Sequence, residues 1–139
     1  MPAFSESSKD ALATCHRALQ AVCRRVIGAY DFTVMEGHRG KYRQQRLLRE
    51  ERTQVDWPHS KHNATPSEAV DIAPYPIDWK AHGRFHVLAG HMMMAFHRLQ
   101  EEGEIDESLS LRWGGDWDGD GSLDDQRFDD LPHFELTGA

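Results

Sequence analysis

Two short segments of the sequence place metal-binding side chain types outside regular helix. The first is SKHNATPSEAVD, in which His62 follows small polar residues and Asp71 lies nine residues later, within AVDIA. A carboxylate in a short apolar strand is costly to bury unless it is paired or binds a cation. The segment therefore indicates a metal site or, alternatively, a capping or salt-bridged Asp71 with a surface His62.

The second segment is DLPHFE, residues 130–135. Pro132 is incompatible with a regular helix and fixes the backbone just before His133. Strand alternation then predicts that His133 and Glu135 lie on one face. Two histidines and one carboxylate leave the fourth position of a tetrahedral zinc ion open, and a further carboxylate nearby can take a proton from water. Together the two segments favour a catalytic zinc site.

The other seven histidines have less informative surroundings. His82 and His86 are four residues apart but lack the internal glutamate of a helical zinc-protease motif, so we expect surface or capping roles. His91 and His97 accompany three methionines in a helix, which favours packing. The remaining three are expected to contact only solvent or substrate: His16, His38 and His59.

An acid-rich segment follows the block LRWGGDWD. Five of its side chains match ligand positions of a calcium loop: Asp116, Asp118, Asp120, Ser122 and Asp124. The last position holds Arg127 instead of the bidentate glutamate. Because the seven aspartates between 116 and 130 repel one another without a cation, we predict a weak Ca²⁺ site here. The alternative is a solvated acidic loop.

Composition indicates one ordinary globular domain over residues 1–139, with 39% hydrophobic and 28% charged residues. The net charge is −7, and residues 1–80 carry 12 basic and 10 acidic side chains against 4 and 13 in residues 81–139. This balance argues against nucleic-acid binding. Since no apolar run approaches the roughly 20 residues of a membrane span and no export signal begins the chain, we expect a protein made in the cytoplasm without stable membrane insertion.

Hydrophobic periodicity supplies the elements that must position these residues. It predicts helices over 5–28, 41–52 and 84–102, strands over 31–36, 69–73, 109–113 and 133–136, and a loop over 55–65. Both cysteines, Cys15 and Cys23, fall in the first helix, too far apart to form a disulfide. Helices and strands alternate without a βαβ rhythm, which predicts an α+β fold.

Five blocks of the sequence resemble a known family. They are EGHRGKYRQQ (36–45), TQVDWPHSKHN (53–63), SEAVDIAPYP (67–76), LRWGGDWD (111–118) and DLPHFEL (130–136). In this order they are similar to the phage endolysin branch of the D-alanyl-D-alanine carboxypeptidase family of zinc peptidases, which includes L-alanyl-D-glutamate endopeptidases. The resemblance implies a small α+β domain of the Hedgehog and D-alanyl-D-alanine peptidase type, in which helices flank a central antiparallel sheet.

The resemblance also implies roles for individual residues. The zinc ligands would be His62, Asp71 and His133. Asp130 would be the general base, and Arg39 would contact the substrate or the oxyanion, with a salt bridge to an acid such as Glu36 as the alternative. This sequence departs from the commonest pattern by two extra residues between the first two ligands and by Ser67 in place of an expected glycine.

The implied function is a zinc endopeptidase that cuts the stem peptide of bacterial peptidoglycan, at the L-alanyl-D-glutamate bond, for host lysis. Without an export signal, such an enzyme would wait in the host cytoplasm as a monomer until a separate membrane pore protein releases it to the wall in the periplasm. Two alternatives are a D-alanyl-D-alanine carboxypeptidase and a non-catalytic, metal-stabilised module that binds the cell wall.

Overall fold

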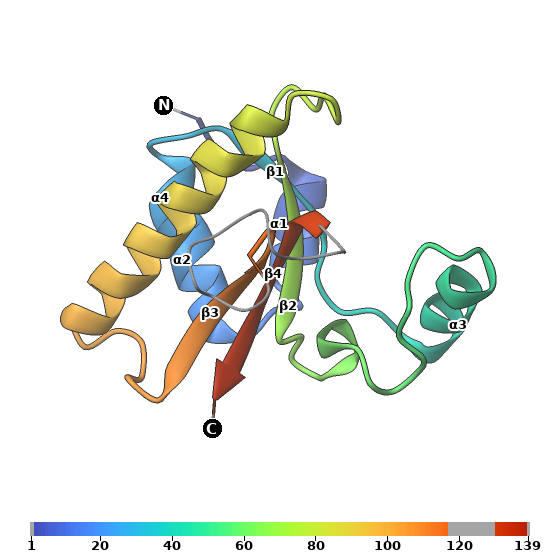
Figure 1. Ribbon diagram of the computed structural model, residues 1–139. Helices are drawn as coiled ribbons and strands as arrows, with labels where there is room; N and C mark the ends of the chain where they lie inside the picture. Colours follow the sequence, from blue (N-terminus) through green and yellow to red (C-terminus); the bar gives the residue numbers. More distant parts are fainter. Residues whose placement is uncertain (1, 117–129, 139) are drawn as a thin grey trace.

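Four antiparallel strands form the centre of the molecule, in the order β1-β2-β4-β3 (Figure 1). The computed structural model describes residues 2–116 and 130–138. The strands are β1 (Phe32–Glu36), β2 (Ala69–Pro74), β3 (Leu109–Gly114) and β4 (Asp130–Gly138). The helices are α1 (Glu6–Leu12), α2 (Arg17–Ile27), α3 (Lys41–Arg49) and α4 (His82–Glu101), with a 3-10 turn η1 (Lys61–Asn63). The α+β fold with a central antiparallel sheet is as expected.

Helix α4 covers one face of the sheet and confirms the predicted helix over 84–102. Its apolar stripe is buried and packs on strands β2, β3 and β4: Phe85, Leu88, Ala89, Met92, Phe96 and Leu99. Helix α2 packs against α4, so the two helices share one hydrophobic core. Burial of one such large apolar side chain contributes about 1.5–3 kcal/mol, which makes this layer the rigid support of the sheet.

The predicted single helix over 5–28 is wrong, because the chain breaks between α1 and α2. Cys15 forms an isolated bridge with Ser67 at the break, and backbone bonds join Ser67 N to Thr14 O (2.9 Å) and His16 N to Ser67 O (2.7 Å). The His16 side chain then caps α2 by accepting from Ala18 N. Periodicity missed the break because apolar residues continue on both sides of it.

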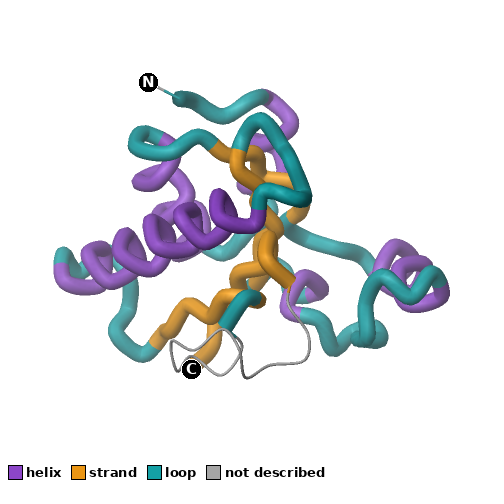
Figure 2. The backbone as a smooth tube through the Cα atoms, turned by 45° about the horizontal axis from the view of Figure 1, so that its top comes forward, coloured by secondary structure: helices purple, strands orange, loops and turns teal. Residues whose placement is uncertain are grey.

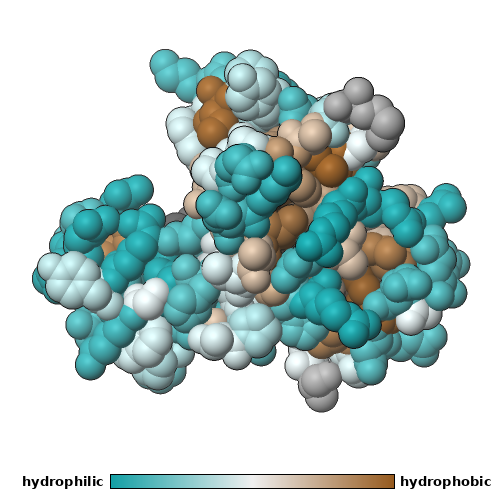
Figure 3. All heavy atoms as spheres, turned by 180° about the vertical axis from the view of Figure 1, so that it is seen from behind, coloured by the Kyte–Doolittle hydropathy of each residue, from teal (hydrophilic) through white to brown (hydrophobic). Residues whose placement is uncertain are grey.

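Helix α3 and the loop after it project from the body of the molecule (Figures 1 and 2). The helix ends at Arg49, three residues before the predicted end, and Glu51 takes a positive φ of 58°. Only Gln44 and Leu47 of this helix are buried. Figure 3 shows that the projecting part, at the left of that view, has a largely hydrophilic surface. None of the helices in the described ranges has both the length and the apolar character needed to cross a membrane.

Candidate active site

The structure brings together the three predicted metal ligands from three separate elements. His62 lies in η1, Asp71 in β2 and His133 in β4. Asp71 Oδ1 is 3.2 Å from His62 Nε2 and 3.1 Å from His133 Nδ1, and one ligand atom from each residue lies within 4.8 Å of the others. In the part of the chain that the structure describes, this is the one cluster of its kind.

Sheet register explains how Asp71 and His133 meet. Strands β2 and β4 are antiparallel neighbours in which Asp71 lies directly opposite His133, so both side chains lie on the same face. Burial would raise the pKa of the Asp71 carboxyl, but the charge of His62 and the hydrogen bond from His133 hold it well below its usual range. Asp71 is therefore an anion at neutral pH, as a metal ligand must be.

Each histidine has one ring nitrogen committed to a neighbour, which leaves the other for a metal. His62 Nδ1 is 2.7 Å from the Gly37 carbonyl oxygen, which can only accept, so Nδ1 carries the proton and Nε2 is the ligand atom. His133 Nε2 is 2.7 Å from Glu135 Oε1, so its Nδ1 faces Asp71. In the protein without metal, burial lowers the pKa of His133, but hydrogen bonds to Asp71 and Glu135 raise it to about 9.

Local structure fixes His62 with little freedom. Ser60 and Asn63 form a capping box around η1, and His62 is 1% exposed. A Cβ atom at Gly37 would lie 2.8 Å from Cys15 Sγ and closer still to neighbouring atoms of α1 and Thr14, so only glycine fits here. The carbonyl that orients His62 therefore comes from a backbone packed directly against the α1–α2 break.

The insertion between His62 and Asp71 forms a closed loop over 62–67. Glu68 N donates to Lys61 O (3.0 Å) across its base, and buried Ser67 binds Ala69 O and Ala69 N through its hydroxyl (2.7 and 3.2 Å). The two extra residues are thus accommodated before β2 begins. The spacing of the ligands along the chain differs from the common pattern without separating them in space.

Asp130 lies at the start of β4, beside the cluster but outside its ligand set. Its Oδ2 atom is 4.0 Å from His133 Nδ1. Burial, and then the charge of Asp71, raise the pKa of Asp130 above its ordinary value. A partly buried carboxyl with a raised pKa next to a metal position is suited to accept and return a proton.

The WGGD block holds the start of β4 in place. Trp113 Nε1 donates to Leu131 O (2.7 Å), and a side chain at Gly114 would overlap the Asp130 carbonyl. Asp116 follows β3 and bridges to Trp113. The other four proposed calcium ligands, Asp118, Asp120, Ser122 and Asp124, lie outside the described residues.

Arg39 makes the salt bridge that was the alternative interpretation of its role. It is buried, and its Nε and Nη2 atoms donate to Glu36 Oε1 (3.1 and 2.6 Å), which is the expected salt bridge. Its Nη2 atom is also 3.5 Å from Asp71 Oδ2. Arg39 thus lies beside the candidate metal ligands and bridges Asp71 and Glu36.

Gln44 and Glu135 have positioning roles that the residue patterns did not reveal. Gln44 is fully buried, accepts from Arg39 Nη1 (3.0 Å) and Asn63 Nδ2 (3.2 Å), and donates to Val55 O (2.6 Å). Glu135 orients His133 and pairs with Arg112 Nη2 at 2.8 Å. A glutamine inside a polar helix gives no hydropathy signal, so only its place in the EGHRGKYRQQ block marked it.

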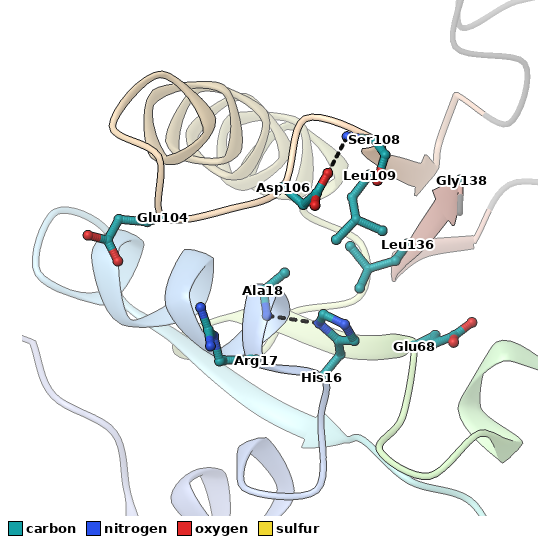
Figure 4. Close-up of a pocket in the computed structure, with 10 residues that line it drawn as sticks. All are labelled: His16, Arg17, Ala18, Glu68, Glu104, Asp106, Ser108, Leu109, Leu136 and Gly138. Carbon is teal, nitrogen blue, oxygen red and sulfur yellow. Dashed lines mark hydrogen bonds between the residues drawn. The ribbon is translucent and has the colours of Figure 1, made fainter.

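A cavity of about 480 Å³ lies between the α3 region and the sheet, and it is lined by Arg39, Asp130, Glu135 and the three metal-ligand residues. A second cavity, of about 460 Å³, lies beside the start of α2 and the end of β4 (Figure 4). In it, Leu109 and Leu136 face each other, while Glu68 and Glu104 lie on opposite sides. The second cavity contains no member of the metal cluster.

The remaining histidines lie outside the cluster. His91 stacks on Tyr30 with ring centroids 5.2 Å apart, as expected for packing. The expectation of packing is wrong for His97, which is exposed and 3.8 Å from Glu101. His59 lines the larger cavity and His16 the second one.

Comparisons with known proteins identify the family of this chain. The family described as phage L-alanyl-D-glutamate peptidase matches residues 2–137. An L-alanyl-D-glutamate peptidase of Escherichia phage T5 is 29% identical over 128 residues, covering 88% of this chain and 87% of its own. The crystal structure of the Serratia marcescens L-Ala D-Glu endopeptidase ChiX superposes with a TM-score of 0.66 at 24% identity, covering 97% of this chain and 90% of that one. The chain belongs to the phage L-alanyl-D-glutamate peptidase family.

Proposed function

We propose that this protein is a zinc endopeptidase that cuts the L-alanyl-D-glutamate bond of peptidoglycan stem peptides. The observation that carries the proposal is the buried cluster of His62, Asp71 and His133 with Asp130 beside it, in a chain of this family. Two imidazoles with committed second nitrogens and one partly buried carboxylate are a donor set found in catalytic zinc sites.

Each residue of the site has a separate role in the proposed hydrolysis. Zinc, when bound, supplies positive charge that polarises a peptide carbonyl and lowers the pKa of water. Asp130 accepts the proton of the attacking water and returns it to the leaving amine. Arg39 holds Asp71 in place and offers donors at the edge of the cavity to the substrate or the developing oxyanion. Glu135 keeps His133 in one tautomer.

Digestion of purified peptidoglycan tests the bond that is cut. Mass analysis of the products should show new free amines on D-glutamate. Released D-alanine would instead identify a D-alanyl-D-alanine carboxypeptidase. Binding without any product would identify a non-catalytic wall-binding module. Elemental analysis of the same preparation should find one zinc ion per chain.

We also propose that the protein serves host lysis as a monomer that a separate pore protein releases from the cytoplasm. Expressing it in the host with and without a pore-forming protein tests this role, since lysis should require both. Sedimentation of the purified protein measures the oligomeric state. A dimer, or lysis without the pore, would contradict these parts of the proposal.

Calcium binding by the acidic loop between β3 and β4 remains a prediction from the sequence. Binding should be weak because Arg127 stands at the last ligand position. A Ca²⁺ concentration one hundred times Kd should stabilise the fold by about 2.7 kcal/mol. Thermal melting with added Ca²⁺ measures this, and the double variant Asp118→Ala, Asp120→Ala is the control. An equal response of both proteins would identify a solvated loop.

A further inference from the structure

The two terminal guanidinium nitrogens of Arg43 are available as hydrogen-bond donors at the wall of the active-site cavity. It lies on α3, lines the cavity together with His62, Asp71 and His133, and its side chain is 43% exposed. Its Nε atom donates to Glu36 Oε2. Within residues 2–116 and 130–138, neither of its two terminal nitrogens makes a hydrogen bond. Paired guanidinium donors of this kind match the two oxygens of a carboxylate.

Two other arginines of the cavity, Arg39 and Arg112, are more fully engaged. All three nitrogens of Arg39 are held by Glu36 and Gln44, and the side chain is buried. Arg112 is bound to Glu135 at 2.8 Å. The last two cations, Arg52 and Lys61, lie near exposed acids, at 3.7 Å from Glu50 and 3.4 Å from Glu68. Unlike them, Arg43 is held beside the metal-ligand residues, because it shares Glu36 with Arg39. Arg43 is therefore the cation best placed to bind an anionic part of a ligand.

The charges around Arg43 favour an anion at this wall. Glu36 is shared between two guanidinium groups, those of Arg39 and Arg43. The other nearby carboxylate, Asp71, is a metal ligand under the proposed function, so Glu36 alone faces two positive charges. Asp130 and Glu135 line the same cavity and would repel an anion. A ligand with one negative charge is thus directed toward Arg43.

The proposed substrate carries a negative charge in the right place. Glutamate has two carboxyl groups, and a peptide chain that passes through it uses only one. The other stays free and lies only a few bonds from the nitrogen of the cleaved bond. When that bond is at the metal-ligand residues, the free carboxylate is close enough to reach the wall of the cavity.

Resting on the proposed function, we propose that Arg43 binds the free carboxylate of the D-glutamate that follows the cleaved bond. The enzyme then selects stem peptides with this carboxylate over peptides in which it is a carboxamide. A charge-assisted hydrogen bond of this type corresponds to about tenfold or more in kcat/KM. Arg43 is a specificity-determining residue, distinct from the groups that bind the metal or transfer the proton.

Two synthetic stem peptides that differ only at this group test the proposal. One contains L-alanyl-D-glutamate with a free carboxylate and the other has the carboxamide. Wild-type enzyme should prefer the carboxylate by about tenfold or more in kcat/KM, and Arg43→Gln should bring the ratio close to one. Arg43→Lys, which keeps the charge but loses the fork, should give an intermediate ratio. Arg46→Gln is the matched control, because Arg46 pairs with Glu50 on the same helix and is not among the residues lining the cavity.

Each outcome separates the inference from the proposed function. Equal cleavage of both peptides by the wild type overturns the inference but leaves the endopeptidase intact. An Arg43→Gln variant that loses activity on both peptides while keeping the wild-type ratio shows that Arg43 only supports Glu36, and also overturns it. Failure of the wild-type, zinc-loaded enzyme to cut either peptide would contradict the proposed function itself.

Discussion

The two cavities of this protein have similar volumes, about 480 and 460 Å³, but different walls. Four polar residues that line the larger one are buried: Arg39, His62, His133 and Glu135. In the second cavity, the buried side chains at the wall are the apolar Ala18 and Leu136, and the charged groups lie toward solvent. Burying polar groups costs free energy unless they are paired, so a cavity that gathers several of them is the stronger candidate for a function.

The two cavities are also formed by different elements of the fold. The larger cavity is formed where α3 and η1 meet strands β2 and β4, so residues distant in sequence converge on it. The second cavity lies at the end of the sheet beside the first turn of α2, and it also gathers residues distant in sequence. Its side-chain hydrogen bonds are nevertheless local: His16 caps Ala18 N, and Asp106 binds Ser108 N. Volume alone does not distinguish these regions, whereas hydrogen bonds between side chains of different elements, such as those from His62 and His133 to Asp71, occur at the larger cavity.

The largest expected effect comes from removing a metal ligand in the larger cavity. His133→Ala should bind no stoichiometric zinc and lose peptidoglycan hydrolysis to background, because two remaining donors hold zinc poorly. Elemental analysis and a lysis assay on outer-membrane-stripped cells measure both properties. Zinc retained at one ion per chain in this variant would refute the ligand assignment.

Removing the proposed base should separate catalysis from metal binding. Asp130→Ala should lower kcat by about a hundredfold or more while one zinc ion remains bound, since Asp130 Oδ2 lies 4.0 Å from the nearest ligand nitrogen. The hydrolysis rate of this variant on purified peptidoglycan and its zinc content test this expectation. Near-normal hydrolysis would move the base elsewhere, although Glu135 is already committed to His133 and Arg112.

A smaller effect is expected from loosening the orientation of a ligand. Glu135→Ala should weaken zinc affinity by about tenfold to a hundredfold, because His133 loses the acceptor that fixes its tautomer. Glu135→Gln keeps an acceptor oxygen and should lose less. Competition with a chelator measures both affinities, and equal losses in the two variants would show that the negative charge of Glu135 matters more than its hydrogen bond.

The smallest effect is expected in the second cavity. Arg17→Ala and Glu104→Gln should leave hydrolysis and zinc content within about twofold of wild type, as for most exposed positions. Both assays are those used for the ligand variants, so the two cavities are compared directly. A large loss of activity in either variant would show that the second cavity contributes to function. It would also show that the presence of buried polar residues does not identify the functional cavity.

The sequence predicted the group of candidate metal-ligand residues better than it predicted the path of the backbone. The residue contexts made His62, Asp71 and His133 candidates, the family resemblance selected them as the ligand set, and the structure places them together. The helix over 5–28 was wrong because the break depends on pairing of Cys15 with Ser67, a contact between distant residues. Local periodicity carries no information about such a partner.

Positioning groups were harder to predict for a similar reason. Gln44 positions the site by accepting hydrogen bonds from Arg39 and Asn63 inside the fold. The residues next to it in the sequence give no indication that it is buried. The tautomer of His62 depends on a backbone carbonyl at Gly37, which no side-chain pattern can indicate. Residue type therefore identified what could bind a metal, while tertiary contacts determine how each group is aimed.

The closed loop between His62 and Asp71 makes this chain a practical scaffold for engineering. Its base is fastened by the Lys61–Glu68 backbone bond and by Ser67, while Thr65 and Pro66 at its tip are exposed. Lengthening a loop whose ends are already joined adds little closure entropy, about 0.6 kcal/mol for each doubling. A peptide that targets a chosen bacterial surface is therefore expected to be tolerated at the tip at little cost in stability.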